Sequence, residues 1–343
     1  MNRYIFLLTL NLGIFLLVQC GGSITERPIA GCIKTYGMPG PEDMDLIRDS
    51  STLLVSSHER RNGLKDLGAI FEISLSDPLS FVPKKIETNY PENFRPHGIS
   101  YAKIKGIDTL VAISHTLQKE YPHSLEIFEK SKDGRWSHKK TLQDSLLISP
   151  NDIFMNEDGE IFVSNDNGTM NSFRKYWDII IKSPRADIVY FNGKTFRNLN
   201  VPVILGNGIH IQKKEDSEIL YRSVFSEGAV HRYKVVRQNG ELSLKFLDKI
   251  EIQSGADNLT EDENGKIWVA GHPSTFGFLK HAISKSLESP TQVFVIDPIT
   301  KIANEVYANR GAEISAGSTG LVFKDKLFIS QVFEDFILSC PRP

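Results

Sequence analysis

Six short stretches of the chain share one pattern: a residue able to bind a metal or form a hydrogen bond stands just before an apolar strand, a turn and a second apolar strand. In the clearest copies the turn is Asp158-Gly159 or Asn264-Gly265, and such dipeptides are strong hairpin signals. The six copies begin at Glu42-Asp43, His97-Gly98, Asn151-Asp152, Asn207-Gly208, Asp257-Asn258 and Ser318-Thr319. Their period of roughly 50 to 60 residues is typical of a four-stranded propeller blade. The sequence therefore predicts an all-β fold, a six-bladed β-propeller.

The repeat also predicts where polar residues gather. The innermost strands of a propeller run around one central channel, so residues at equivalent strand starts converge on its axis. Carboxylate and amide oxygens would meet there, with no thiol among them, from Glu42, Asn151, Asn207, Asp257 and Asn258. Such a set suits calcium, and a cation would relieve the repulsion between the buried carboxylates. The alternative is that these residues only cap hairpins.

Length and charge narrow the class of protein. The chain of 343 residues suits a single closed propeller, which we expect over residues 31–343. The formal net charge is -2. With no basic excess, nucleic acid is not expected as a partner.

The N-terminus has the pattern of an export signal. Asn2-Arg3 precedes an apolar run from Tyr4 to Val18, so residues 1–19 are predicted to be a signal peptide. The sequence before Cys20 resembles a bacterial lipobox, although Gln19 is unusual there. We expect a lipidated Cys20, a flexible tether over residues 20–30 and a protein anchored to the membrane of the cell envelope. One alternative is an uncleaved anchor. The other is a plain secretory signal, which would leave the protein secreted or periplasmic.

Two further cysteines stand at the two ends of the folded part. Export permits a disulfide between Cys32 and Cys340, and a ring-shaped fold needs its first and last strands fastened where they meet. We therefore expect an end-to-end disulfide that closes the propeller. The alternative is a pair of free, buried thiols.

Taken in order, these residues and several neighbours resemble the paraoxonase/arylesterase family. The resemblance spans nearly all of residues 31–341. It is carried by Cys32, Glu42-Asp43, Pro96-His97-Gly98-Ile99-Ser100, Asn151-Asp152-Ile153, Asn207-Gly208-Ile209, Asp257-Asn258, Trp268-Val269, His272-Pro273, Gly317-Ser318-Thr319 and Cys340. It implies a six-bladed propeller with two calcium ions in its channel and an end-to-end disulfide. The implied activity is hydrolysis of lactones and aryl esters, with phosphotriesters as a side activity.

The resemblance also implies roles for single residues. A catalytic calcium would be held by Glu42, Asn151, Asn207, Asp257 and Asn258. A deeper structural calcium would be held by Asp43, Asp152 and the carbonyl of Ile99. The active-site histidines would be His97, His115 and His272.

The histidines differ in how well their positions alone support these roles. His97 occupies the strand-start position that supplies a calcium ligand in other blades, where a nearby cation would keep its imidazole neutral, as a general base must be. His115 ends the next strand of that blade, so it would orient His97 and carry its proton away. The alternatives are a structural imidazole at His97 or His115 and a turn residue at His272.

Two segments depart from the family pattern. Ser57 to Leu67 is shorter than the loop that covers the active site in the animal enzymes and lacks its aromatic residue, so the resemblance does not imply a lid here. The segment around Tyr176-Trp177 is altered too, and its aromatic residues would wall a pocket or pack on the rim.

Other functions remain as alternatives to this hydrolase. One is a non-catalytic surface propeller that calcium only braces and that binds an envelope or host partner. Another is a gluconolactonase-like propeller that uses a carboxylate as its base. The sequence contains neither G-x-S-x-G nor H-E-x-x-H, so serine-hydrolase and zincin mechanisms lack support.

Overall fold

The computed structural model describes residues 24–61, 65–77, 81–215 and 217–343. The predicted signal peptide and the predicted lipidation site Cys20 lie outside these residues. Of the predicted tether, Arg27 forms a backbone bridge with Ala308, so this part lies against the propeller. Among the described residues, no helix is long and apolar enough to cross a bilayer.

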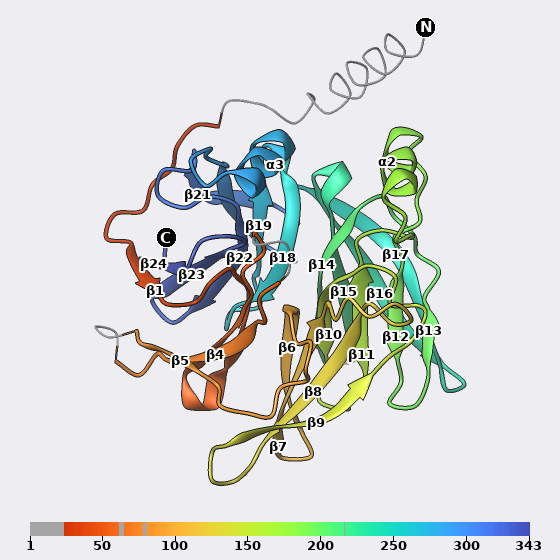
Figure 1. Ribbon diagram of the computed structural model, residues 1–343. Helices are drawn as coiled ribbons and strands as arrows, with labels where there is room; N and C mark the ends of the chain where they lie inside the picture. Colours follow the sequence, from red (N-terminus) through yellow and green to blue (C-terminus); the bar gives the residue numbers. More distant parts are fainter. Residues whose placement is uncertain (1–23, 62–64, 78–80, 216) are drawn as a thin grey trace, which may run out of the picture.

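Six four-stranded antiparallel sheets surround a central channel (Figure 1), which confirms the predicted six-bladed propeller. The innermost strands are β2 (Pro41–Ile47), β6 (Pro96–Ile104), β10 (Pro150–Met155), β14 (Gly206–Lys214), β18 (Gly255–Glu261) and β22 (Gly317–Phe323). The second strands are β3 (Thr52–Ser57), β7 (Ile107–Ser114), β11 (Ile161–Asn165), β15 (Ser217–Val224), β19 (Ile267–His272) and β23 (Lys326–Gln331).

The outer half of each blade completes the sheet. The third strands are β4 (Ala69–Ser74), β8 (Ser124–Lys130), β12 (Ile188–Phe191), β16 (Ala229–Gln238), β20 (Thr291–Ile296) and β24 (Phe336–Pro341). The outermost strands are β5 (Pro83–Lys85), β9 (Trp136–Leu142), β13 (Phe196–Asn198), β17 (Glu241–Glu251), β21 (Ala303–Asn309) and, in the last blade, β1 (Ile33–Tyr36). Both faces of a blade's inner half are covered by neighbouring blades, as where Leu54 and Ile70 pack against Leu110 and Phe128. Because both faces are buried, the sequences of the second strands are nearly continuous apolar runs.

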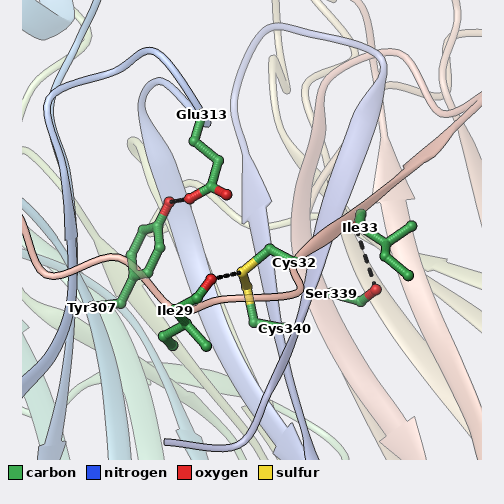
Figure 2. Close-up of a disulfide and its surroundings, with 7 residues drawn as sticks. All are labelled: Ile29, Cys32, Ile33, Tyr307, Glu313, Ser339 and Cys340. Carbon is green, nitrogen blue, oxygen red and sulfur yellow. Dashed lines mark hydrogen bonds between the residues drawn. A yellow bond between two sulfur atoms is a disulfide. The ribbon is translucent and has the colours of Figure 1, made fainter.

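The last blade takes strands from both ends of the chain. β1 pairs with β24 and brings Ile33 opposite Ser339, and the disulfide between Cys32 and Cys340 lies beside this pair (Figure 2). The Ser339 hydroxyl also donates to the Ile33 carbonyl at 3.3 Å. The predicted disulfide is therefore confirmed, and the alternative of two free thiols is wrong.

Each innermost strand carries a β-bulge at its polar residues. The sequence pattern predicts that these residues stand just before the strands, but the structure includes them in the strands as irregular positions. The register shifts lie between Pro41 and Met44, Pro96 and Ile99, Pro150 and Asp152, Gly206 and Ile209, Ala256 and Leu259, and Gly317 and Gly320. A bulge puts an extra residue into one strand and re-aims its side chains. All six blades thus interrupt their pairing where polar side chains enter the channel.

Two short helices, which the sequence analysis did not predict, lie at the same end of the propeller (Figure 1). Helix α2 (Ser172–Ile180) follows β11, and helix α3 (Thr275–Ile283) follows β19. Their N-terminal N–H groups are capped by the side chains of Asn171 and Ser274. Two 3-10 turns, η2 (Arg48–Ser50) and η3 (Phe225–Glu227), complete the described helical elements.

The disulfide should contribute strongly to stability, because it closes a loop with a sequence separation of 308 residues. The chain-entropy model gives about 6 kcal/mol for a loop of this size, as an upper value. We expect the double variant Cys32→Ser/Cys340→Ser to unfold at a clearly lower urea concentration, while Ser339→Ala shifts the midpoint only slightly. Equal midpoints for the double variant and the unaltered protein would contradict this account.

Candidate active site

A cavity of about 470 Å³ opens at the end of the channel that α3 covers. Its floor includes Glu42, His97, Asn151, Asn207 and Asp257. Its walls are mostly apolar, and they are formed by Leu205, Phe225, Phe278, Leu279, Val332 and Phe333. A polar floor inside apolar walls is typical of sites that bind small organic molecules.

Four oxygen atoms at or directly beside this floor are buried and have no hydrogen-bond partner among the described residues. They are Glu42 Oε2, Asn151 Oδ1, Asn207 Oδ1 and Asn258 Oδ1. Each buried polar atom without a partner costs about 1–3 kcal/mol, so four of them in one place need a further explanation. All four belong to residues that the sequence analysis predicts as calcium ligands. A hard cation bound to these oxygens would satisfy them together.

The amide orientation of Asn258 supports this view. Its Nδ2 donates to Glu42 Oε1 at 3.1 Å and to Thr319 Oγ1 at 3.0 Å, which directs Oδ1 away from these acceptors. Among the described residues, no group of three or more His, Cys, Asp or Glu side chains is arranged to hold a metal. The five predicted ligands comprise only two acids, Glu42 and Asp257, so a cation there would depend on amide oxygens as well.

Glu42 remains a carboxylate at neutral pH. Burial raises its pKa, but the neighbouring His97, the guanidinium of Arg60 and a hydrogen bond from Ser318 lower the pKa to about 2. The Ser318 hydroxyl donates to Glu42 Oε1 at 2.7 Å. One oxygen of this carboxylate is thus occupied, while Oε2 is the atom without a partner.

Asp257 is held in place by two neighbours. His272 Nε2 lies 2.7 Å from Asp257 Oδ2, and the Ser318 hydroxyl donates to the same oxygen at 2.9 Å. The His272 ring packs against Phe278 and Phe225. The structure therefore puts His272 in the cavity wall, in contact with a predicted ligand, where it orients a carboxylate.

The predicted deeper site consists of two buried carboxylates, Asp43 and Asp152. Burial raises the pKa of Asp43 well above its usual range, and the charges of Asp152 and Glu42 raise it further. Burial raises the pKa of Asp152 as well. Such a pair favours a proton or a cation between its members.

Both carboxylates also connect neighbouring blades. Asp43 Oδ2 accepts a hydrogen bond from the Ile99 N–H, and Asp152 Oδ2 accepts one from the Ile209 N–H, each at 2.7 Å. The contact that the structure records for Ile99 is thus through its N–H, and ligation by its carbonyl stays a prediction. A second cavity, of about 640 Å³, reaches Asp43 and Asp152 from the other end of the channel.

The predicted histidine pair is present in the structure. His97 Nδ1 lies 2.7 Å from His115 Nε2, and His97 Nε2 faces Glu42 Oε2 at 3.5 Å. Burial lowers the pKa of His115 well below its usual range, and the charge of His97 lowers it further. His115 is therefore neutral at physiological pH and able to accept or pass on a hydrogen bond.

The segment Ser57 to Leu67, which departs from the family pattern, borders the cavity through Arg60. Arg60 lines the cavity and donates to the backbone carbonyls of Gly40 and His58 at 3.0 Å. Arg61 lies over the ring of Phe333 and pairs with Glu334 at 2.9 Å. Sequence analysis missed both roles, because a basic pair in a loop is usually solvated. Residues 62–64 lie outside the described residues.

The aromatic pair Tyr176-Trp177 does not line the cavity. Both side chains lie on α2 and are exposed, so they do not wall the pocket. The apolar wall is supplied mainly by Phe225, Phe278 and Phe333. No short-range pattern identifies these residues, since they come from a 3-10 turn, a helix and a loop in different blades.

Two glycines allow the inner strands to approach at the site. A Cβ atom on Gly98 would lie 2.7 Å from the Asn151 carbonyl oxygen, and one on Gly208 would lie 2.5 Å from the Asp257 carbonyl oxygen. Each glycine follows a channel residue of one blade and touches a predicted ligand of the next. The ligand positions thus depend on backbone contacts that only glycine permits.

Fold and site together define a class: a β-propeller with an oxygen-rich polar cluster and a histidine pair at one end of its channel. A sequence model of the family described as Arylesterase matches residues 84–340, and the chain belongs to this family. Membership in the paraoxonase/arylesterase family supports the assignment of this protein to the hydrolases.

The most similar curated proteins include paraoxonases. Serum paraoxonase/arylesterase 2 of Gallus gallus is 26% identical over 311 residues, which cover 86% of this chain and 84% of the relative. Serum paraoxonase/arylesterase 1 of Homo sapiens is 23% identical over 312 residues, with the same coverage. Among solved structures, a gluconolactonase from Xanthomonas campestris superposes with a TM-score of 0.54 at 13% identity and covers 93% of this chain and 94% of its own. At this identity the likeness concerns the fold alone.

We expect Gly208→Ala to destabilise the fold and disturb the site, because the added methyl group would push against Asp257 and Asn258. Overpacking of this kind typically costs about 1–3 kcal/mol. Gly277→Ala in α3 is the matched control, since its Cβ would meet nothing nearer than 3.1 Å. Thermal unfolding of both variants tests this expectation, and equal melting temperatures would show that the strands tolerate a side chain there.

Proposed function

We propose that this protein is a calcium-dependent hydrolase of lactones and aryl esters. The observation that carries the proposal is the group of four buried oxygens without partners next to the histidine pair. Oxygens of this kind fit a hard cation, and a histidine beside them fits general-base chemistry. Family membership supports the hydrolase class independently.

In this proposal the five channel-mouth residues hold the catalytic calcium: Glu42, Asn151, Asn207, Asp257 and Asn258. A calcium ion bound there would supply Lewis-acid polarisation of the substrate carbonyl and stabilisation of the developing negative charge. His272 and Ser318 keep Asp257 oriented through their contacts with Oδ2. Asp43, Asp152 and the carbonyl of Ile99 hold the second, structural calcium.

The histidine pair handles the proton of the attacking water. His97 borders the cavity and its Nε2 faces the floor, so Nε2 is the atom that would accept the proton. His115 holds the other ring nitrogen of His97 at 2.7 Å and keeps the ring oriented. The apolar walls bind the non-reacting part of the substrate, and their breadth suits aliphatic as well as aromatic groups.

The test is hydrolysis of a panel of aliphatic lactones and phenyl acetate by the protein from residue 24 onward. We expect turnover that is lost with a chelator and restored by calcium. His97→Gln and Asp257→Asn should each reduce kcat/KM by about 10²-fold or more. The control His210→Gln alters a histidine that lines the other cavity and contacts Glu261, and it should leave turnover unchanged.

Each failure of this test has a distinct meaning. Retained activity in His97→Gln would favour a carboxylate base. A folded, calcium-loaded protein that hydrolyses nothing in the panel would favour the non-catalytic propeller. Activity that a chelator does not affect would refute the catalytic calcium.

We also propose that the protein works at a lipid surface, with the cavity facing the membrane. Helices α2 and α3 lie at the cavity end and expose large apolar side chains, among them Phe173, Trp177, Phe276 and Ile283. Such side chains at one end of a protein insert into the boundary between headgroups and acyl chains. Lipidation of Cys20 would add a second anchor, and stable membrane binding generally takes two.

Vesicle flotation of the protein from residue 24 onward tests this surface without the lipid anchor. We expect Phe173→Ser/Ile283→Ser to bind phospholipid vesicles several-fold more weakly, since both side chains are more than three-quarters exposed, at 78% and 85%. The control Ile107→Ser/Ile299→Ser removes two exposed side chains at the other end of the strands, one at the start of β7 and one in the loop between β20 and β21, and should change nothing. Equal binding of all three proteins would contradict the proposal.

A further inference from the structure

A third histidine continues the His97–His115 pair away from the cavity. His115 Nδ1 lies 2.8 Å from His123 Nδ1, and the two rings meet edge to face with centroids 4.9 Å apart. His123 in turn hydrogen-bonds the backbone carbonyl of Ile148. The three imidazoles therefore form one chain that runs from Glu42 at the cavity floor to a backbone carbonyl.

The Ile148 carbonyl determines which nitrogen donates and which accepts in each hydrogen bond of this row of histidines. A carbonyl oxygen only accepts hydrogen bonds, so the His123 nitrogen that faces Ile148 must carry a proton. Because Nδ1 of His123 already faces His115, that nitrogen is Nε2. A neutral imidazole carries one proton, so Nδ1 of His123 is an acceptor and Nδ1 of His115 donates to it.

The same reasoning extends to the cavity. With its proton on Nδ1, His115 presents Nε2 as an acceptor, so Nδ1 of His97 donates to it across 2.7 Å. In the neutral ring of His97, Nε2 then carries no proton. This is the nitrogen that faces the cavity floor, and it is left with a free lone pair.

The environment keeps His115 and His123 neutral. Burial lowers the pKa of His123 to about 4, and Lys175 on α2 lowers it while Asp166 partly opposes this effect. Burial also lowers the pKa of His115, and protonation of the neighbouring His97 or His123 would disfavour a charge on His115 further. At neutral pH each of these rings therefore carries a single proton.

The distances around His97, at the cavity end of this row, are consistent with His97 donating from Nδ1 rather than from Nε2. The ring-to-ring contacts are 2.7 and 2.8 Å, whereas His97 Nε2 and Glu42 Oε2 are 3.5 Å apart. That separation is longer than an N–H to carboxylate hydrogen bond. The reverse direction would turn an unprotonated His123 nitrogen towards the Ile148 carbonyl, with two lone pairs facing each other in a largely buried place.

We propose that His123 is a positioning residue: together with the Ile148 carbonyl, it holds His97 in the tautomer whose Nε2 lone pair faces the cavity. The consequence for hydrolysis rests on the proposed function, since only a base needs that lone pair. The tautomer itself depends on the hydrogen-bond chain alone.

The decisive experiment is ¹⁵N NMR of the imidazole nitrogens in full-length protein labelled at histidine. We expect His97 and His115 to be protonated on Nδ1. In His123→Leu the acceptor is lost, and both rings should shift their proton to Nε2. In His123→Asn the amide oxygen replaces the Nδ1 acceptor, and the original tautomers should return.

Hydrolysis provides the second readout. Because the wrong tautomer cannot accept the proton of water, kcat should fall by about 10²-fold or more in His123→Leu with little change in KM, and His123→Asn should recover most of it. A His97 protonated on Nε2 in the unaltered protein, or unchanged tautomers in His123→Leu, would overturn the proposal. If His123→Leu does not fold, the unaltered protein and His123→Asn decide the question. Expected tautomers without hydrolysis by any form would contradict the proposed function only.

Discussion

The arrangement of this protein depends on the burial of acidic and amide oxygens around a single axis. Carboxylates in a protein interior are costly unless they are paired or bind a cation. Here Glu42, Asp43, Asp152 and Asp257 are all almost fully buried, and several oxygens near them have no partner. Four blades contribute these oxygens at the bulge of their innermost strands, and the bulges of the other two, in β6 and β22, contribute His97 and Ser318. The channel is therefore held by interactions that a cation would complete.

The same cluster explains how the ring holds together. Asp43 and Asp152 accept N–H groups from the next blade, while the Ser330 hydroxyl of the last blade donates to the Glu42 carbonyl of the first at 2.6 Å. The disulfide between Cys32 and Cys340 fastens the outer edge of the closing blade. Polar contacts at the axis and a covalent bond at the rim thus close the same ring, and both ends of the chain meet in one sheet.

Much of the fold was predictable, because each blade repeats a local signal. A polar dipeptide, an apolar run and a tight turn recur at a blade-length period, so blade number and the channel-facing residues follow from spacing alone. The bulges were not predictable, since they depend on how β2 and its counterparts pair with the next strand. His123, Arg60 and Phe278 were also missed. Each acts through a neighbour distant in sequence, such as the Ile148 carbonyl or Glu42, and a single histidine or a basic pair in a loop carries no periodic signal.

The sequence by itself determined the six-bladed architecture, the residues that line the channel and the two cysteines at its ends. These properties come from local patterns, whose period is imposed by strand and turn geometry. Only the tertiary structure decided which oxygens are left without partners, which histidine nitrogens face one another and which segments wall the cavity. Those features depend on distances of 2.7 to 3.5 Å between residues of different strands and blades. Such distances arise only when the ring closes and adjacent inner strands pack together across glycine.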